Sequence, residues 1–247
     1  MEGVVCRAYG ESALLLEFGS EITPQINAQV RQAGLVIEQK AIQGVLEVVG
    51  AYASLLVIYD PLVCSYARLE EELQNLELGI PSRRRPEEQV SLVSIPTCYE
   101  LGLDLEFVST HTHLSPAQIV QKHSGRDYLV YMLGFLPGFA YLGGLDPSLA
   151  VPRLAQPRAE VAPGSVGIAH AQTGIYPLKS PGGWQIIGKT PLKLYDPHKN
   201  PPVLLQAGDY VRYEPISLEQ YQQLEHQIAQ GGYEPQRTQI GRGDLHV

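Results

Sequence analysis

Residues 162–191 read APGSVGIAHAQTGIYPLKSPGGWQIIGKTP. Glycine and proline recur every few residues in this stretch and around it, and they divide the chain into short β-runs up to about residue 215. The runs are SVGIAH (165–170), WQIIG (184–188), PLKLYD (191–196) and YVRYEP (210–215). Short strands separated so regularly by turn residues predict an antiparallel β-barrel or β-sandwich.

The segment before these β-runs predicts one helix and one strand. Ser115, Pro116 and Gln118 form a capping box with proline in the first helical turn. The helix should end at Ser124-Gly125, where glycine supplies a typical stop. Residues 127–133, DYLVYML, follow as an apolar strand.

The first 95 residues have a different pattern, in which strand-like and helix-like segments alternate. Strand candidates are residues 13–18, two runs within 44–61 that form a hairpin, and residues 90–95. One helix begins at Thr23-Pro24 and should end near Gly34, and leucines at helical spacing predict a second helix over 66–78. The order strand, helix, strand, strand, helix, strand predicts a small α+β domain of the ferredoxin-like kind, and the alternative is that its last strand leads into the next domain.

These patterns together predict two domains, for which a chain of 247 residues is long enough. We expect a small α/β domain at 1–85 and a mostly β domain with inserted helices at 90–216. Ser217 and Gln220 then cap a polar C-terminal helix, and the tail up to residue 247 should be mobile.

The charge and the apolar pattern exclude several classes of partner. A net charge of −8 argues against binding nucleic acid or an acidic membrane, because both need a clustered basic face. The basic run Arg83-Arg84-Arg85 lies among prolines and glutamates, which favours a solvated linker over a docking patch. No stretch approaches the roughly 20 apolar residues that span a bilayer. We therefore expect neither a nucleic acid nor a membrane as partner.

The N-terminus and the cysteines indicate a cytoplasmic protein. The opening residues MEGVVCRAYGES carry an early acidic residue and no long apolar core, so we expect no signal peptide. Cys6, Cys64 and Cys98 are an odd number without C-x-x-C spacing, which suits a reducing compartment and predicts neither a disulfide framework nor a zinc site.

One short pattern suggests a phosphate-binding loop. Gly183, four residues, then Gly188-Lys189-Thr190 match the P-loop spacing. A working P-loop needs a helix after the Lys-Thr pair, since the free amides of its first turn bind the phosphates. Here Pro191 begins an alternating, strand-like run, so we interpret the match as a coincidence. Lys189 could still reach an anion, although a solvated lysine on a strand is the plainer interpretation.

Aromatic and basic residues gather in the predicted β-domain. The stretch GFLPGFAYLGGLDP (134–147) holds Phe135 and Phe139 beside four glycines, which suits either a core corner or the wall of a pocket. Arg153 and Arg158 lie on short proline-stiffened loops. A guanidinium near aromatic and polar side chains is typical of a site for a small carboxylate or phosphate.

The motifs of this region resemble those of a known family. GFLPGFAYLGGLD, PR…PR, GSVGIA, QTGIYP, SPGGW, IGKTP and GDYVRYEP occur in the order found in the family that contains the 5-oxoprolinase subunit PxpB, the sporulation-kinase inhibitor KipI and proteins labelled allophanate hydrolase subunit 1. The resemblance covers nearly the whole chain. It implies an N-terminal α/β domain and a C-terminal cyclophilin-like β-barrel, as found in carboxyltransferase domains.

The function implied by the resemblance is that of one subunit of an ATP-dependent 5-oxoprolinase, which converts 5-oxo-L-proline to L-glutamate. Its partners would be a PxpC/KipA-like subunit and a PxpA-like subunit, and the site for ATP on this chain stays open. Two alternatives remain: a KipI-like inhibitor of histidine-kinase autophosphorylation, and half of a urea-carboxylase-like carboxyltransferase. The family pattern is altered at 97–106, at His170-Ala171 and at Lys189, which weakens transfer of the substrate.

Opening a lactam requires groups that bind its anion, bind phosphate and move a proton. As catalytic candidates we take Arg153 and Arg158 for the anions and His123 for the proton, although His123 could equally be a histidine at a helix end. No metal is expected, because His111 and His113 lack a third ligand. The predicted substrate-binding residues are Phe135, Phe139, Gln172, Tyr176, Trp184 and Lys189. Asp104 and Asp209 are expected to be a helix cap and a turn residue.

Overall fold

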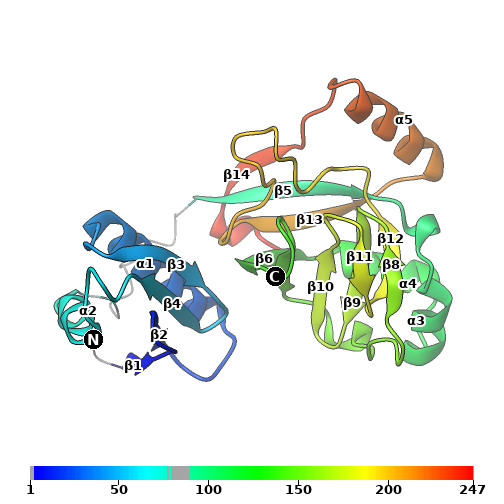
Figure 1. Cartoon of the computed structure of the whole chain (residues 1–247). Helices are drawn as coiled ribbons and strands as arrows, with labels where there is room; N and C mark the ends of the chain where they lie inside the picture. Colours follow the sequence, from blue (N-terminus) through cyan, green and yellow to red (C-terminus); the bar gives the residue numbers. More distant parts are fainter. Residues whose placement is uncertain (1–2, 77, 79–88, 247) are drawn as a thin grey trace. The chain divides into compact units, whose positions relative to one another are not determined.

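The computed structural model describes residues 3–76, 78 and 89–246 and divides the chain into two compact units, Met1–Arg85 and Pro86–Val247 (Figure 1). The predicted basic linker at residues 83–85 lies outside the described residues. Among the helices that the structure describes, none has the length and apolarity needed to cross a membrane.

The first unit is a four-stranded antiparallel sheet with two helices. The strand order is β1-β2-β4-β3, so β1 and β3 form the edges. Its buried core joins residues such as Leu14, Val30 and Leu69 from the sheet and both helices. The elements are β1 (Val5–Ala8), β2 (Ala13–Glu17), α1 (Pro24–Lys40), β3 (Val45–Gly50), β4 (Ser54–Tyr59) and α2 (Tyr66–Gln74).

Helix α1 begins as predicted but is longer than predicted. The Thr23 hydroxyl accepts a hydrogen bond from the Ile26 amide, and proline occupies the first turn. The predicted end at Gly34 is wrong, because the helix continues to Lys40 and stops at Ala41, whose φ of 49° is left-handed. One glycine inside a helix costs only about 1 kcal/mol, which burial of neighbouring apolar residues outweighs.

The strand at residues 90–95, which the sequence left open between the two domains, belongs to the second unit. Residues 90–95 lie within β5 (Gln89–Thr97), which pairs with strands of the second unit. The edge beside β2 is filled instead by β1, which the sequence did not signal because only four exposed or half-buried residues form it. The predicted helices and hairpin are therefore present. The strand that completes the sheet is β1, near the N-terminus, and not residues 90–95.

The second unit is an eight-stranded sheet that closes on itself. Its order is β12-β9-β10-β7-β6-β13-β5-β14, with β5 and β13 parallel and the other pairs antiparallel. Directly after β5, Cys98 exchanges backbone hydrogen bonds with Lys189 of β12 at 2.8 and 2.9 Å. This bridge joins the two sides of the sheet and makes it a barrel. The strands are β6 (Asp127–Leu133), β7 (Ala140–Gly143), β9 (Ser165–Ala169), β10 (Gln172–Ile175), β12 (Gln185–Lys189), β13 (Tyr210–Pro215) and β14 (Arg237–Gly241).

The remaining elements cover the barrel (Figure 1). Helices α3 (Leu105–Thr112) and α4 (Pro116–Ser124) pack against each other and against β12 and β13, respectively. Strands β8 (Arg158–Val161) and β11 (Ser180–Gly182) form a separate two-stranded ribbon. Helix α5 (Leu218–Ala229) has the predicted capping box, as α4 does.

Alternate residues of the same strands face two different clusters. On β7, Ala140 and Leu142 point into the barrel core, while Phe139 before it and Tyr141 belong to a second, aromatic cluster. This follows from the period of two in strands. The barrel thus has an apolar interior and, on one outer face, an aromatic cluster that also includes Val161 of the ribbon.

Two local predictions in this unit were wrong. Residues 191–196 form no strand beyond a single bridge at Tyr195, although Leu192 and Leu194 alternate inward as the pattern required. The C-terminal tail is ordered, because β14 pairs with β5 over five residues and the His246 amide bonds Asp127. Exposed polar residues such as those of β14 carry no strand signal, and only backbone pairing fixes them.

Candidate functional site

A cavity of about 280 Å³ opens beside the aromatic cluster of the barrel. Three separate segments contribute to it: the stretch around β7, the proline-rich loop before β8, and the stretch around β11. Its size and its aromatic walls suit a small organic molecule. The lining residues are Phe135, Phe139, Tyr141, Arg153, Pro157, Tyr176, Pro181, Gly182, Gly183 and Trp184.

Phe139 is the centre of the aromatic wall. Its ring meets those of Tyr141, Tyr176 and Trp184 edge to face, with centroids 5.2, 5.5 and 5.6 Å apart. Edge-to-face contacts of this kind contribute about 0.5–1.5 kcal/mol each beyond their buried area. Phe139, Tyr176 and Trp184 are almost completely buried, so the wall is preformed and rigid.

The Trp184 indole lies close against the backbone of neighbouring strands. A side chain at Gly174 would approach the indole to 3.0 Å and the Phe139 ring to 3.4 Å. Glycine at this position of the strand therefore leaves room for the indole and the Phe139 ring. Trp184 is the only tryptophan in the chain.

Phe135 lies at the rim of the cavity in an unusual conformation. Its φ of 69° is left-handed, which is rare for a bulky residue, and 63% of its surface is exposed. Its ring contacts Phe139 edge to face at 5.5 Å. An exposed aromatic ring at a cavity rim favours cover by a ligand or a partner chain.

Arg153 is the one cationic side chain among the described residues that line the cavity. It is exposed, and no described residue holds its guanidinium by a hydrogen bond or ion pair. Burial raises the pKa of the Tyr176 hydroxyl, while a backbone hydrogen bond at Trp184 and the positive charges of Arg153 and Arg158 oppose that rise. The cavity therefore offers a neutral hydroxyl group and a guanidinium beside an apolar wall.

Arg158 lies behind this wall, not in the cavity, and its guanidinium is already bound. Its Nη2 donates to Asp104 Oδ1 at 2.6 Å, and its Nη1 donates to the Trp184 carbonyl at 3.4 Å. The other Asp104 oxygen accepts from the Ile186 amide at 2.6 Å. Asp104 stands at the N-cap of α3, as predicted, but its side chain makes no capping hydrogen bond and is used in the ion pair instead.

His123 lies in the barrel core and not in the cavity. Its Nδ1 is 2.7 Å from the Tyr99 hydroxyl and its Nε2 is 2.8 Å from Thr173 Oγ1. Because Thr173 donates its own proton to the Gly167 carbonyl, it accepts one from Nε2, and Nδ1 accepts from Tyr99. Burial lowers the pKa of His123 to about 3, so the ring is neutral near pH 7.

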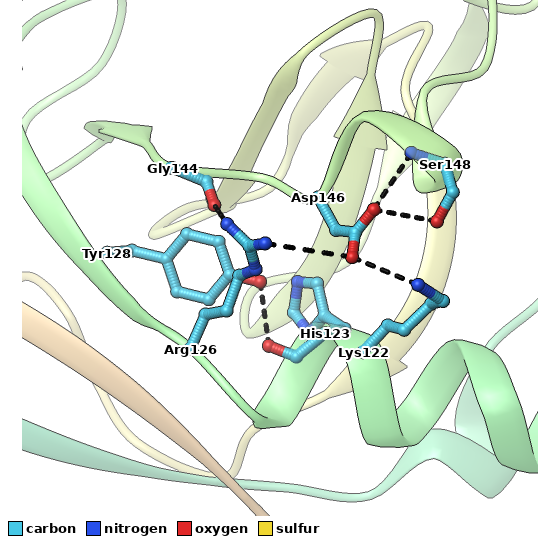
Figure 2. Close-up of polar contacts among 7 residues, drawn as sticks. All are labelled: Lys122, His123, Arg126, Tyr128, Gly144, Asp146 and Ser148. Carbon is cyan, nitrogen blue, oxygen red and sulfur yellow. Dashed lines mark hydrogen bonds and ion pairs between the residues drawn. The ribbon is translucent and has the colours of Figure 1, made fainter. Parts of the chain in front are cut away.

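Further polar contacts connect the end of α4, which carries His123, to neighbouring segments (Figure 2). The Tyr128 hydroxyl donates to the His123 carbonyl at 2.7 Å. Asp146, from the glycine-rich stretch 134–147, binds Lys122 at 3.1 Å and accepts from the amide and hydroxyl of Ser148. These hydrogen bonds lower the pKa of Asp146 to about 2. The loop that follows β7 is thereby fastened to the helix.

The last two predicted residues also lie outside the cavity lining. Gln172 begins β10 and pairs with Ala169 in the turn to β9. Lys189 ends β12, and its Nζ lies 5.8 Å from the centre of the Tyr221 ring. No helix follows Thr190, whose hydroxyl accepts from the Leu192 amide. The structure thus confirms that the GxxxxGKT match is no P-loop.

Of the nine residues predicted for the site, the structure brings five together around the cavity and places four elsewhere. Tyr141 was not predicted, although its spacing of two from Phe139 puts both on one face of β7. The pairing of Asp104 was not predicted either, because its partners lie 54 and 82 residues away along the chain. The cavity residues are Phe135, Phe139, Arg153, Tyr176 and Trp184; the others are His123, Arg158, Gln172 and Lys189.

Comparison with known proteins establishes the family. Residues 4–205 match the family described as carboxyltransferase domain, subdomain C and D. A 5-oxoprolinase subunit of Bacillus subtilis is 43% identical over 230 residues, which cover 86% of this chain and 92% of that protein. The chain belongs to this family. The corresponding 5-oxoprolinase subunit of Escherichia coli O157:H7 is 38% identical, over 87% of this chain and 97% of that one.

Two solved structures share the fold of this chain. TTHA0988 superposes with a TM-score of 0.74 at 36% identity, over 83% of this chain, which spans only 40% of that longer protein. The urea amidolyase of K. lactis superposes with a TM-score of 0.79 over 96% of this chain and 16% of its own length. At 19% identity, the second likeness shows the fold alone.

Proposed function

We propose that this chain is a subunit of an ATP-dependent 5-oxoprolinase and that its cavity binds 5-oxo-L-proline. The family membership supports the reaction, since relatives 38% and 43% identical over most of the chain are 5-oxoprolinase subunits. The observation that carries the site is the single guanidinium, Arg153, beside an aromatic wall in a cavity of about 280 Å³.

5-Oxoproline is a five-membered lactam with a carboxylate on the ring carbon beside the nitrogen. Its methylene groups suit the aromatic wall of Phe139 and Trp184, and its carboxylate suits the bidentate donors of Arg153. The Tyr176 hydroxyl, kept neutral by burial, is placed to donate to the lactam. One charged contact and one apolar wall are enough to orient a molecule of this size.

The lactam is activated by ATP in this proposal. The γ-phosphoryl group of ATP passes to the lactam oxygen, and ADP leaves. One water then adds to the former carbonyl carbon of the lactam. The ring C–N bond breaks, which frees the amino group and gives an acyl phosphate. A second water releases phosphate and leaves L-glutamate. The roles of this chain are to bind the carboxylate through Arg153 and to shield the reacting ring from bulk water.

Partner subunits supply the phosphate chemistry in this proposal. The stretch 183–190 lacks the helix of a P-loop, and we assign ATP to the partners of this chain in a cytoplasmic complex, a PxpC/KipA-like subunit and a PxpA-like subunit. We further describe the closed sheet of the second unit as a cyclophilin-like barrel and the first unit as a variant of the ferredoxin-like sandwich. Phe135, exposed at the cavity rim, is the residue that we expect a partner or the substrate to cover.

The test is the Arg153→Gln substitution in the reconstituted complex. A charge-assisted contact contributes about 1.5–3 kcal/mol, so kcat/KM for 5-oxoproline should fall by roughly 10–150-fold. The melting temperature should not change, because no described residue makes a hydrogen bond or ion pair with the Arg153 guanidinium. Arg7→Gln, which removes another exposed arginine, one that pairs with Glu17 in the first unit, is the control and should retain wild-type kinetics. Wild-type kcat/KM for Arg153→Gln would refute the assignment of the site.

A further inference from the structure

The Asp104–Arg158 ion pair lies directly behind the wall of the cavity. It joins two segments that are 54 residues apart in the chain, the loop before α3 and the first residue of β8. The two side chains are only 10% and 27% exposed, so water screens the pair weakly. An isolated buried carboxylate would be costly, which means that the pair and its further hydrogen bonds hold each other in place.

The hydrogen bonds of this pair converge on the backbone around Trp184. Arg158 donates to the Trp184 carbonyl, and Asp104 accepts from the Ile186 amide, so the two side chains hold the chain on both sides of Gln185. The Asp104 amide adds a bond to the Ile186 carbonyl at 2.8 Å. Three hydrogen bonds thus hold the backbone from Trp184, in the cavity wall, to Ile186, in strand β12.

We propose that Asp104 and Arg158 are positioning residues, whose ion pair sets the Trp184 indole in the wall that receives the substrate ring. The role in the reaction rests on the proposed function, whereas the effect on Trp184 does not. Neither side chain lines the cavity, so neither touches substrate. They act through the backbone of residues 184–186, and the indole is then held between Phe139 and Gly174.

The barrel contains a matched ion pair that does not contact the cavity. Arg212 Nε and Nη2 donate to both oxygens of Asp127 at 2.7 Å, and Asp127 is almost completely buried. The further bond of Asp127 goes to the His246 amide near the C-terminus. Breaking this pair should cost stability of a similar kind without moving Trp184, which makes Asp127→Asn the control for Asp104→Asn.

The first experiment uses the fluorescence of Trp184 in the full chain. Asp104→Asn and the milder Arg158→Lys, which keeps the charge but not the fork of donors, should shift the Trp184 emission to longer wavelength and raise its quenching by acrylamide. Asp127→Asn should leave both unchanged at a temperature where all variants are folded. Wild-type emission and quenching in both Asp104→Asn and Arg158→Lys would overturn the proposal.

The second experiment measures 5-oxoproline turnover in the reconstituted complex. A misplaced wall residue should raise KM by about 10–100-fold in Asp104→Asn and Arg158→Lys, with kcat affected less. An altered emission with wild-type KM would overturn the role of the pair in substrate binding. A wild-type complex without 5-oxoproline turnover would instead refute the proposed function, and the emission of the variants would still decide whether the pair positions Trp184.

Discussion

His123 should make the barrel unit less stable in mild acid, and its substitution by glutamine should remove this effect. In the folded protein burial lowers its pKa to about 3, whereas in the unfolded chain it titrates near its ordinary value of 6.5. Between these values the unfolded state binds a proton that the folded state does not. Stability contributed by the neutral ring is therefore fully present above pH 6.5 and is lost as the pH falls toward 3.

The size of the effect follows from the two pKa values. The linkage relation gives a loss of about 2 kcal/mol in the free energy of unfolding between pH 7 and pH 5. For a domain of this size that loss lowers the melting temperature by roughly 4–8 °C. Asp146, with its pKa lowered to about 2, loses its contribution only below its ordinary value of 3.8, so it does not titrate in this window.

The assay is urea unfolding at pH 7 and at pH 5, followed by the fluorescence of Trp184, which lies in the same unit as His123. Glutamine offers Tyr99 an acceptor and Thr173 a donor without titrating. The difference between the two pH values should therefore shrink by about 2 kcal/mol in His123→Gln. The same substitution at exposed His198 is the matched control and should keep the wild-type difference. An equal pH dependence in wild type and His123→Gln would refute the burial of a neutral His123.

Three further predictions concern the barrel and Lys189. Gly164→Ala should lower the free energy of unfolding by about 2 kcal/mol or more, because φ is +80° and the new Cβ would collide with the Thr190 carbonyl. The control is Gly231→Ala, where φ is +74° but the space around the Cβ is open. In the same urea assay it should cost about 1 kcal/mol. Leu142→Ala, at a completely buried position, should cost about 2–5 kcal/mol by urea unfolding, whereas Leu103→Ala, at a position 73% exposed, should stay within about 0.5 kcal/mol. Lys189→Gln should leave ATP-dependent turnover of the complex within about 3-fold of wild type. It should lower the free energy of unfolding by about 1 kcal/mol, because the contact of Lys189 with the Tyr221 ring is lost. Loss of turnover in this variant would contradict the interpretation that Lys189 does not bind phosphate.

Local signals in the sequence were enough to place several elements. The capping box at Ser115 and the apolar run 127–133 predicted α4 and β6 with the bounds that the structure has. Glycine near aromatic residues left a core corner and a pocket wall open, and in the structure Phe139 is both buried and part of the cavity lining. In each of these cases the physical cause lies within about ten residues of the chain.

Non-local pairing accounts for what the sequence did not reveal. Residues 90–95 look the same whether they complete one sheet or the other, and only their partners in β13 and β14 decide. Arg158 and His123 were predicted for the site from residue type, local context and family motifs. Their contacts in the structure are with Asp104, Tyr99 and Thr173, which no local pattern connects to them.

The most direct test of the proposed function is a subunit-omission assay. The chain is co-expressed with its partner subunits, and ATP-dependent release of L-glutamate from 5-oxo-L-proline is measured with each subunit left out in turn. We predict that turnover requires this chain together with its partners. Undiminished turnover without this chain, or a complete complex that assembles and does not act on 5-oxoproline, would contradict the account.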